Sequence, residues 1–233
     1  MIRENADEIA DAIQKDLGRC KSETAVFDLD LLEADINEAI KNLHYWTKPE
    51  YVTKSLMYTV MSCYVHREPL GVALIIGAWN YPIQLVVLPL IGAIAAGNCA
   101  VLKPSEISKN SAELIANLIP KYLDNECFKV VCGGVDETTE LLEQKFDKIF
   151  YTGNNTVGKI VMTAAAKHLT PVVLELGGKC PVYVADDADL KISANRLVWA
   201  KMLNCGQTCV APDFILCSDK IQVSAFHAVL GTV

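Results

Sequence analysis

A cysteine in a polar loop is the strongest candidate for chemistry in this sequence. Cys209 follows Gly206, Gln207 and Thr208, shortly after a run with helical periodicity, residues 194–203. A cysteine kept for packing normally has apolar neighbours, whereas a glycine in a loop lets a ligand approach the backbone closely. The pattern indicates a nucleophilic thiol, although burial as a small hydrophobic side chain is the commoner role of a cysteine taken alone.

Two polar side chains at predicted strand ends could complete this chemistry. Asn80 follows the apolar run 72–76, and its side-chain amide could donate to a developing oxyanion. A turn-forming Asn is the alternative. Glu175 ends the predicted strand 172–175, two residues before a pair of glycines. We expect this carboxylate to be partly buried, which suits a general base, while a capping or ion-paired Glu is the alternative.

Two further loops carry residues suited to a dinucleotide. Lys103 and Glu106 lie on one Pro-containing loop, where the carboxylate could accept hydrogen bonds from a ribose diol; a solvated loop that begins a helix is the alternative. Gly153, Asn154 and Gly158 lie between a predicted strand and a helix, where free N–H groups and the helix dipole favour a pyrophosphate. This spacing is neither GxGxxG nor a P-loop, so alone it is weak evidence.

The elements that must position these residues are predicted by periodicity. Residues 1–43 are amphipathic and helical with a break at Gly18, and residues 56–67 form an extended, hairpin-like stretch. From residue 71 apolar strands alternate with helices. The predicted strands are 72–76, 100–103, 128–132, 148–151, 172–175 and 182–184, and the helices between them are 85–96, 111–123, 137–144 and 157–168.

This alternation predicts an α/β fold with a Rossmann-type, doubly wound parallel sheet. Ligands on such sheets bind beyond the carboxyl ends of the strands, where all four polar loops begin. We expect N-terminal helices and a hairpin at 1–68, a nucleotide-binding domain at 69–203 and the start of a catalytic domain at 204–233.

Composition restricts the partners and the compartment. The chain is 52% hydrophobic, with a formal net charge of −7 and no block of Lys or Arg, which argues against nucleic acid and anionic membranes as partners. Its nine cysteines are scattered singly and no signal peptide follows Met1, which indicates a cytoplasmic chain without a metal site. Residues 69–102 are uncharged, but their prolines and polar residues make a membrane span the less favoured alternative.

Seven short strings, read in order along the chain, are characteristic: Glu68-Pro69-Leu70-Gly71-Val72, Trp79-Asn80-Tyr81-Pro82, Lys103-Pro104-Ser105-Glu106, Tyr151-Thr152-Gly153, Ala164-Ala165-Ala166-Lys167-His168-Leu169-Thr170-Pro171, Leu174-Glu175-Leu176-Gly177-Gly178-Lys179 and Gly206-Gln207-Thr208-Cys209. In these strings the chain resembles the NAD(P)-dependent aldehyde dehydrogenase family, and most closely its class 3 group, which acts on fatty and aromatic aldehydes. Only residues 221–233 resemble nothing that we can place.

The resemblance implies roles for the candidate residues. The Cys209 thiolate would attack the aldehyde carbon, and the Asn80 side chain with the Cys209 backbone N–H would hold the oxyanion. After hydride transfer to the nicotinamide, Glu175 would activate the water that hydrolyses the thioester to a carboxylic acid. The implied cofactor is NAD, with NADP possible, and the implied cofactor-binding residues are Trp79, Lys103, Glu106, Gly153, Asn154, Gly158 and Leu176.

The sequence departs from the family pattern in three respects. Asn155 stands where relatives usually have Ser or Thr, Cys180 replaces the Ser that precedes Pro181, and family members are much longer. We therefore expect a fragment or truncated isoform without dehydrogenase activity. The whole protein would be a homodimer, and any membrane attachment would use a tail outside these residues.

Three other functions are weighed against this one. A truncated chain that binds only nucleotide or a partner protein is the main alternative. A cysteine hydrolase is disfavoured because it needs a histidine base, and His44, His66, His168 and His227 lie outside the strand-end loops. A CoA-acylating dehydrogenase is disfavoured because it would lack the water-activating Glu175.

Overall fold

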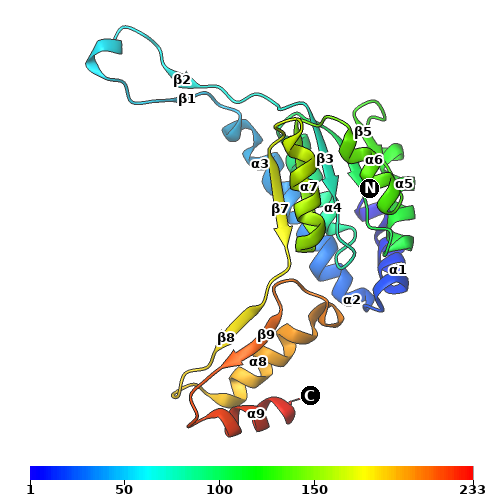
Figure 1. Ribbon diagram of the computed structural model, residues 1–233, viewed down its shortest axis with the longest axis vertical. Helices are drawn as coiled ribbons and strands as arrows, with labels where there is room; N and C mark the ends of the chain where they lie inside the picture. The colour runs from blue at the N-terminus through cyan, green and yellow to red at the C-terminus, as the bar shows by residue number, and fades with distance from the viewer. Residues whose placement is uncertain (233) are drawn as a thin grey trace.

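The fold, seen in a computed structural model that describes residues 1–232, has three parts (Figure 1). A five-stranded parallel sheet with helices on both faces forms the main body. A long hairpin projects from one end of this body, and a smaller unit built from two strands and two helices lies at the other end.

The five-stranded sheet sets the position of the candidate loops. Its strands are β3 (Val72–Ile76), β4 (Cys99–Lys103), β5 (Phe128–Val130), β6 (Lys148–Gly153) and β7 (Val172–Leu176), all parallel, in the order β5-β4-β3-β6-β7. The chain runs outward from β3 to β5, then returns to the other side of β3 for β6 and β7. Because the strand order reverses beside β3, a crevice opens at the carboxyl ends there. This topology confirms the predicted doubly wound α/β fold.

Helices cover both faces of the sheet, which explains why β3 is a continuous apolar run. Successive side chains of a strand point to opposite faces. Ile75 accordingly packs with Val86 of α4 (Gln84–Ala95) and Ile119 of α5 (Lys109–Tyr122), whereas Leu74 packs with Val161 of α7 (Asn155–Ala166). The remaining helix of this region, α6 (Val135–Glu143), packs on the same face as α7 and contributes Leu142 to the cluster that contains Leu74 and Val161.

The N-terminal segment forms a helical layer against α4 and α5. Its elements are η1 (Arg3–Asn5), α1 (Ala6–Leu17), α2 (Lys21–Thr24), the π-helical η2 (Ala25–Asp30) and α3 (Leu31–Trp46). The predicted break at Gly18 is confirmed, since this residue ends α1 with a φ of 74°, a conformation that favours glycine. Asp16 at the end of α1 accepts hydrogen bonds from the backbone N–H groups of Asn110 and Ser111, at 3.0 and 2.7 Å, and so caps the start of α5.

The hairpin consists of β1 (Glu50–Tyr51) and β2 (Tyr64–Val65), with the short helix η3 (Leu56–Tyr58) between them. It extends away from the body in Figure 1. Leu56, Met57 and Val60 near its tip are 87%, 80% and 92% exposed. An apolar tip left this exposed by residues 1–232 is a surface suited to contact with another protein.

The smaller unit corrects one expectation from the sequence. It contains β8 (Cys180–Tyr183), α8 (Leu190–Met202), η4 (Leu203–Gly206), β9 (Pro212–Leu216) and α9 (Gln222–Leu230). The strand predicted at 182–184 is β8, and it pairs with β9 in a separate two-stranded sheet, not with the five-stranded sheet. Sequence reasoning missed β9 and α9. Among residues 1–232, no helix combines the length and apolar character needed to cross a membrane.

Candidate active site

A cleft of about 670 Å³ lies beyond the carboxyl ends of the parallel strands. Its lining contains almost every residue that the sequence predicted. The three proposed catalytic residues line it together with six of the proposed cofactor residues: Asn80, Glu175, Cys209, Trp79, Lys103, Glu106, Gly153, Asn154 and Leu176. Gly158 is the exception. It is buried in the first part of α7, where an added Cβ would lie 2.9 Å from Leu176 Cδ2.

The loops that carry Asn80 and Cys209 are tied together directly. The Asn80 side-chain Nδ2 donates to the carbonyl oxygen of Gln207 at 2.9 Å. The hydroxyl groups of Tyr81 and Thr208 are 2.9 Å apart. Because a side-chain amide carries two N–H groups, the bond to Gln207 leaves a second one for a ligand. Cys209 itself is exposed and lines the cleft, as a reactive thiol requires.

A fully buried asparagine joins the same two loops from behind. Asn204 donates through Nδ2 to the carbonyl oxygens of Asn80, at 2.7 Å, and Gln207, at 3.2 Å. Asn204 and Cys205 both have a φ of 55°, so the chain turns sharply as it leaves α8 and enters the Cys209 loop. Sequence reasoning gave Asn204 no role, although it lies five residues before the predicted nucleophile.

Asn204 is in turn held by the buried side chain of Arg19, which sequence reasoning missed. Arg19, which is 0% exposed, donates from Nη1 to Asn204 Oδ1 at 3.0 Å and from Nε to Thr24 Oγ1 at 3.2 Å. Its guanidinium also forms an ion pair with buried Asp28 and lies 5.2 Å from the centre of the Tyr81 ring. The N-terminal helices therefore support the candidate site across 185 positions of sequence.

Burial dominates the electrostatics of this network. It raises the pKa of Asp28 to about 6 even though the charge of Arg19 and its hydrogen bond oppose the shift. Burial also raises the pKa of Tyr81, against the hydrogen bond with Thr208. Both shifts follow from the cost of placing a charge in a low-dielectric interior. No simple sequence signal marks Arg19, because its partners Thr24, Asp28 and Asn204 come from three separate elements, α2, η2 and η4.

The expectation that Glu175 is partly buried is wrong. Glu175 lies at the end of β7, where it pairs in register with Thr152 of β6, and it is exposed. The reason is that β7 is the edge strand of the five-stranded sheet, and an added Cβ on the following Gly177 would meet nothing within 4 Å. The side chain still lines the cleft that contains Cys209.

Lys103 and Glu106 form an ion pair in the same cleft, on the opposite side of β3 from Glu175. The Lys103 side chain is almost fully buried, and its Nζ lies 2.7 Å from Glu106 Oε2. Burial acts to raise the pKa of Glu106, but the hydrogen bond from Lys103, a backbone hydrogen bond and the Lys103 charge outweigh it, so the pKa of Glu106 is lowered. Glu106 is therefore a carboxylate at neutral pH and able to accept hydrogen bonds from a diol.

The polar groups of the cleft fit a dinucleotide. Thr152 Oγ1, which lines the cleft, is buried and has no hydrogen-bond partner among the described residues. Asn154 caps α7 by accepting from the Val157 backbone N–H at 2.9 Å, which leaves other N–H groups of the first turn for an anion. Val135 and Ile160, 77% and 56% exposed, add apolar surface to the cleft. A cation, a diol acceptor, a helix N-terminus and apolar walls are what a dinucleotide needs.

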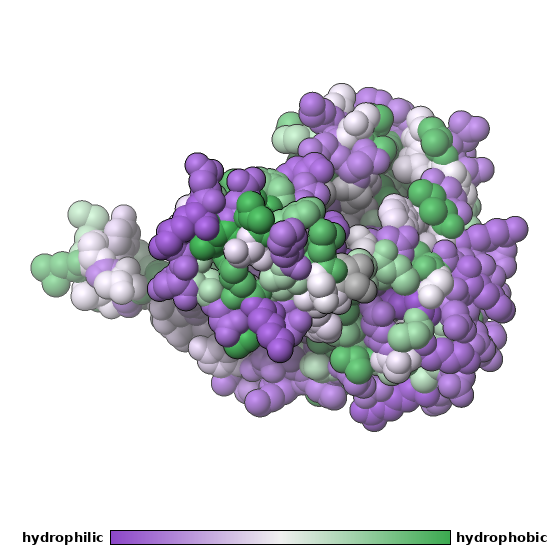
Figure 2. Space-filling model, turned by 90° about the horizontal axis from the view of Figure 1, so that it is seen from below, coloured by the Kyte–Doolittle hydropathy of each residue, from purple (hydrophilic) through white to green (hydrophobic). Residues whose placement is uncertain are grey.

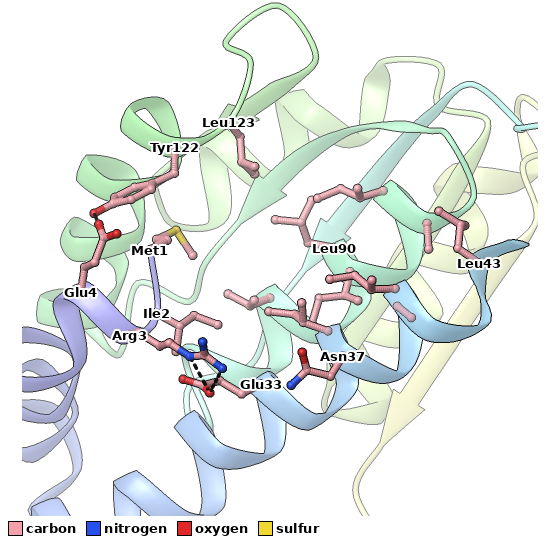
Figure 3. A pocket seen from close by; sticks show the side chains of 17 residues that line it. Met1, Ile2, Arg3, Glu4, Glu33, Asn37, Leu43, Leu90, Tyr122 and Leu123 are labelled. Atoms are coloured by element: carbon pink, nitrogen blue, oxygen red, sulfur yellow. Dashed lines mark hydrogen bonds and ion pairs between the residues drawn. The ribbon is translucent and has the colours of Figure 1, made fainter.

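A second cavity, of about 630 Å³, lacks such chemistry (Figure 3). It lies between the N-terminal residues, α3, α4 and the end of α5, and side chains such as Ile2, Leu43 and Leu90 make it largely apolar. An ion pair between Arg3 and Glu33, at 2.8 Å, crosses one side. Its lining contains neither a cysteine nor a histidine. The candidate active site is therefore the cleft at the strand ends.

Comparison with known proteins gives one consistent result. A sequence model of the aldehyde dehydrogenase family matches residues 1–231. The chain is 53% identical to aldehyde dehydrogenase family 3 member B2 of Mus musculus, covering 100% of this chain and 48% of that protein. It is 50% identical to family 3 member B1 of Homo sapiens, covering 100% of this chain and 50% of that protein. The chain thus spans about half the length of these relatives.

Solved structures agree. The substrate-bound state of Staphylococcus aureus AldH superimposes with a TM-score of 0.96 at 41% identity, over 99% of this chain and 50% of that one. A Mycobacterium tuberculosis aldehyde dehydrogenase complexed with NAD+ superimposes with a TM-score of 0.90 at 28% identity, over 100% and 48%. The family match includes β9 and nearly all of the stretch from residue 221 that the sequence motifs left unplaced.

Proposed function

The chain belongs to the aldehyde dehydrogenase family, and we propose that it carries the cofactor cleft and the reactive thiol of an NAD-dependent enzyme that oxidises aldehydes to carboxylic acids. One observation carries the proposal. Candidate residues from five separate loops, spread from Trp79 to Cys209, line a single cleft at the strand-order reversal. A cysteine kept for packing would be buried, whereas Cys209 opens onto this cleft beside a carboxylate and a side-chain amide.

In the proposed reaction, the chain's own residues bind and activate the aldehyde. The Cys209 thiolate adds to the carbonyl carbon, and the second N–H of the Asn80 side chain donates to the oxyanion that forms. Nicotinamide, when bound, supplies the acceptor that makes the step an oxidation and leaves a thioester on Cys209. Glu175 then takes a proton from the water that hydrolyses this thioester. Removing one oxyanion donor typically lowers the rate by about 10²–10³.

The cofactor is proposed to lie along the rest of the cleft. Glu106 accepts from the ribose diol, Lys103 keeps that carboxylate ionised and placed, and the first turn of α7 faces the pyrophosphate. A carboxylate at the diol disfavours a 2′-phosphate, which supports NAD over NADP. Gly158 contributes by close packing, since a side chain there would displace Leu176 from the cleft wall.

Substrate class, subunit arrangement and location are parts of the same proposal. The likeness to family 3 members supports medium-chain, long-chain or aromatic aldehydes. The hairpin, which Figure 2 shows as a knob on one side of the molecule with hydrophobic residues at its end, supports a homodimer. Nine unpaired cysteines favour a reducing compartment, the cytoplasm.

We also propose a division of the chain into three functional parts. Residues 1–68 are the N-terminal helices and hairpin, and the five strands between residues 69 and 176 form the nucleotide-binding domain. Because β8 pairs with β9, the catalytic domain begins near residue 177 and not at residue 204.

Two readouts on the purified chain test the proposal. NAD is titrated while the fluorescence of the tryptophans is followed, since Trp79 lines the cleft, and NADH formation from octanal is then measured at 340 nm. Cys209→Ala is expected to bind NAD and form no NADH, while the matched control Cys205→Ser, an exposed cysteine of the same loop, behaves as wild type.

The two readouts also separate the candidate functions. NAD binding without NADH formation in the wild-type chain would favour the alternative function, a nucleotide-binding module, and would match the inactive chain expected from the sequence. Absence of NAD binding, or NADH formation that survives in Cys209→Ala, would contradict the proposed enzyme.

A further inference from the structure

A second thiol contacts the Cys209 loop from outside the cleft. Cys180 is half-buried at the start of β8, and its Sγ donates to the carbonyl oxygen of Cys209 at 3.6 Å. The contact is closely packed: an added Cβ on Gly178 would lie 3.1 Å from Cys180 Sγ and 3.2 Å from Cys209 O. Gly178 therefore lets the two cysteines approach each other.

The strand pairing supports this approach. The register between β8 and β9 shifts at Cys180, which pairs with Pro212 while the next residue, Pro181, pairs with Phe214. Such an irregularity redirects a side chain locally. Here it lies beside the turn that leads from Cys209 into β9. Both thiols are free in the structure, and Cys209 is the more exposed.

We propose that Cys180 is the resolving thiol of Cys209, so that the two form a reversible disulfide under peroxide stress. The Cys209 thiolate attacks hydrogen peroxide, which oxidises it to a sulfenic acid as the peroxide O–O bond breaks and water or hydroxide leaves. The Cys180 sulfur then attacks Cys209 Sγ, the S–O bond breaks, and a second water leaves. The balance is two thiols and one peroxide to one disulfide and two waters.

This disulfide would switch the site off without destroying it. Cys209 lines the cleft and Cys180 does not, so a bond between them draws the Cys209 sulfur toward β8 and away from the substrate side. Closing the bond requires movement of the exposed Cys209 loop, while the backbone pairing of β8 and β9 is kept. A resolving thiol also competes with further oxidation of the sulfenic acid, which would be irreversible.

The test follows the oxidation state of each cysteine by mass. The reduced chain is treated with hydrogen peroxide, its remaining thiols are alkylated, and its peptides are analysed by mass spectrometry with and without dithiothreitol. We expect a peptide pair linked through Cys180 and Cys209 that dithiothreitol separates. In Cys180→Ser, which keeps a hydroxyl donor for the Cys209 carbonyl, Cys209 should reach the sulfinic acid several-fold faster than in the wild type.

Cys205→Ser is the matched control, because Cys205 is an exposed thiol in the same loop. The 180–209 link should form equally in this variant. A wild-type link between Cys205 and Cys209, or equal rates of irreversible Cys209 oxidation in the wild type and Cys180→Ser, would overturn the proposal. No cofactor or aldehyde enters the measurement, so this result is independent of whether the proposed dehydrogenase activity is correct. The wild-type peptides decide the question even if a variant fails to fold.

Discussion

The buried pair of Asp28 and Arg19 predicts an unusual dependence of stability on pH. The pKa of Asp28 rises from its ordinary value of 3.8 to about 6 because burial disfavours its charge more than Arg19 favours it. Between these two values the folded chain holds a proton that the unfolded chain has released. The free energy of unfolding therefore falls as pH rises through this interval, the reverse of the usual behaviour of a paired carboxylate.

The size of the effect follows from the two pKa values. The interval from 3.8 to about 6, at 1.36 kcal/mol for each pH unit, corresponds to about 3 kcal/mol of stability. This contribution is fully present below pH 3.8 and is lost as pH passes 6. Nearby Glu23 acts in the same direction, because its negative charge also opposes ionisation of Asp28.

The assay is urea unfolding followed by circular dichroism at several pH values from 4 to 7. Asp28→Asn removes the titration but keeps the shape of the side chain. Subtracting the variant's free energy of unfolding from that of the wild type at each pH therefore isolates the contribution of Asp28. We expect this difference to fall by about 2 kcal/mol from pH 4 to pH 7, somewhat less than the full effect because the unfolded Asp28 is still partly protonated at pH 4. Asp30→Asn, on the exposed side of the same segment, is the control. A difference that stays constant or rises with pH for Asp28→Asn would refute the reasoning.

Two further predictions concern the packing behind the cleft. Asn204→Ala should lower the free energy of unfolding by about 2–5 kcal/mol, because it leaves a buried guanidinium N–H of Arg19 without a partner and removes the hydrogen bond to the carbonyl of Asn80. Chemical denaturation measures this, and a loss no larger than that of the exposed Asn195→Ala would contradict it. Gly77→Ala should cost about 1–3 kcal/mol, since the added Cβ would lie 2.4 Å from Val86 Cγ2. An unchanged thermal midpoint in this variant would show that α4 can move away.

The local pattern of apolar residues was sufficient to predict most strands and helices of the five-stranded sheet. The predicted strand at 72–76 is β3 (Val72–Ile76), and the helix predicted at 85–96 is α4 (Gln84–Ala95). Both are long apolar runs, so their periodicity is read directly from the chain. In contrast, β9 was missed because most of its side chains are exposed, and an exposed short strand has no alternation of apolar and polar residues to detect.

The sequence by itself determined which residue types follow each strand, and with them the edge of the sheet that Asn80, Lys103 and Gly153 share. Strand ends meet at one edge of any doubly wound sheet, so this needs only the order of elements. Only the tertiary structure decided that Glu175 is exposed on an edge strand and that Arg19 supports the site from 185 positions away. Burial and long-range pairing depend on which surfaces meet, and periodicity along the chain carries no information about that.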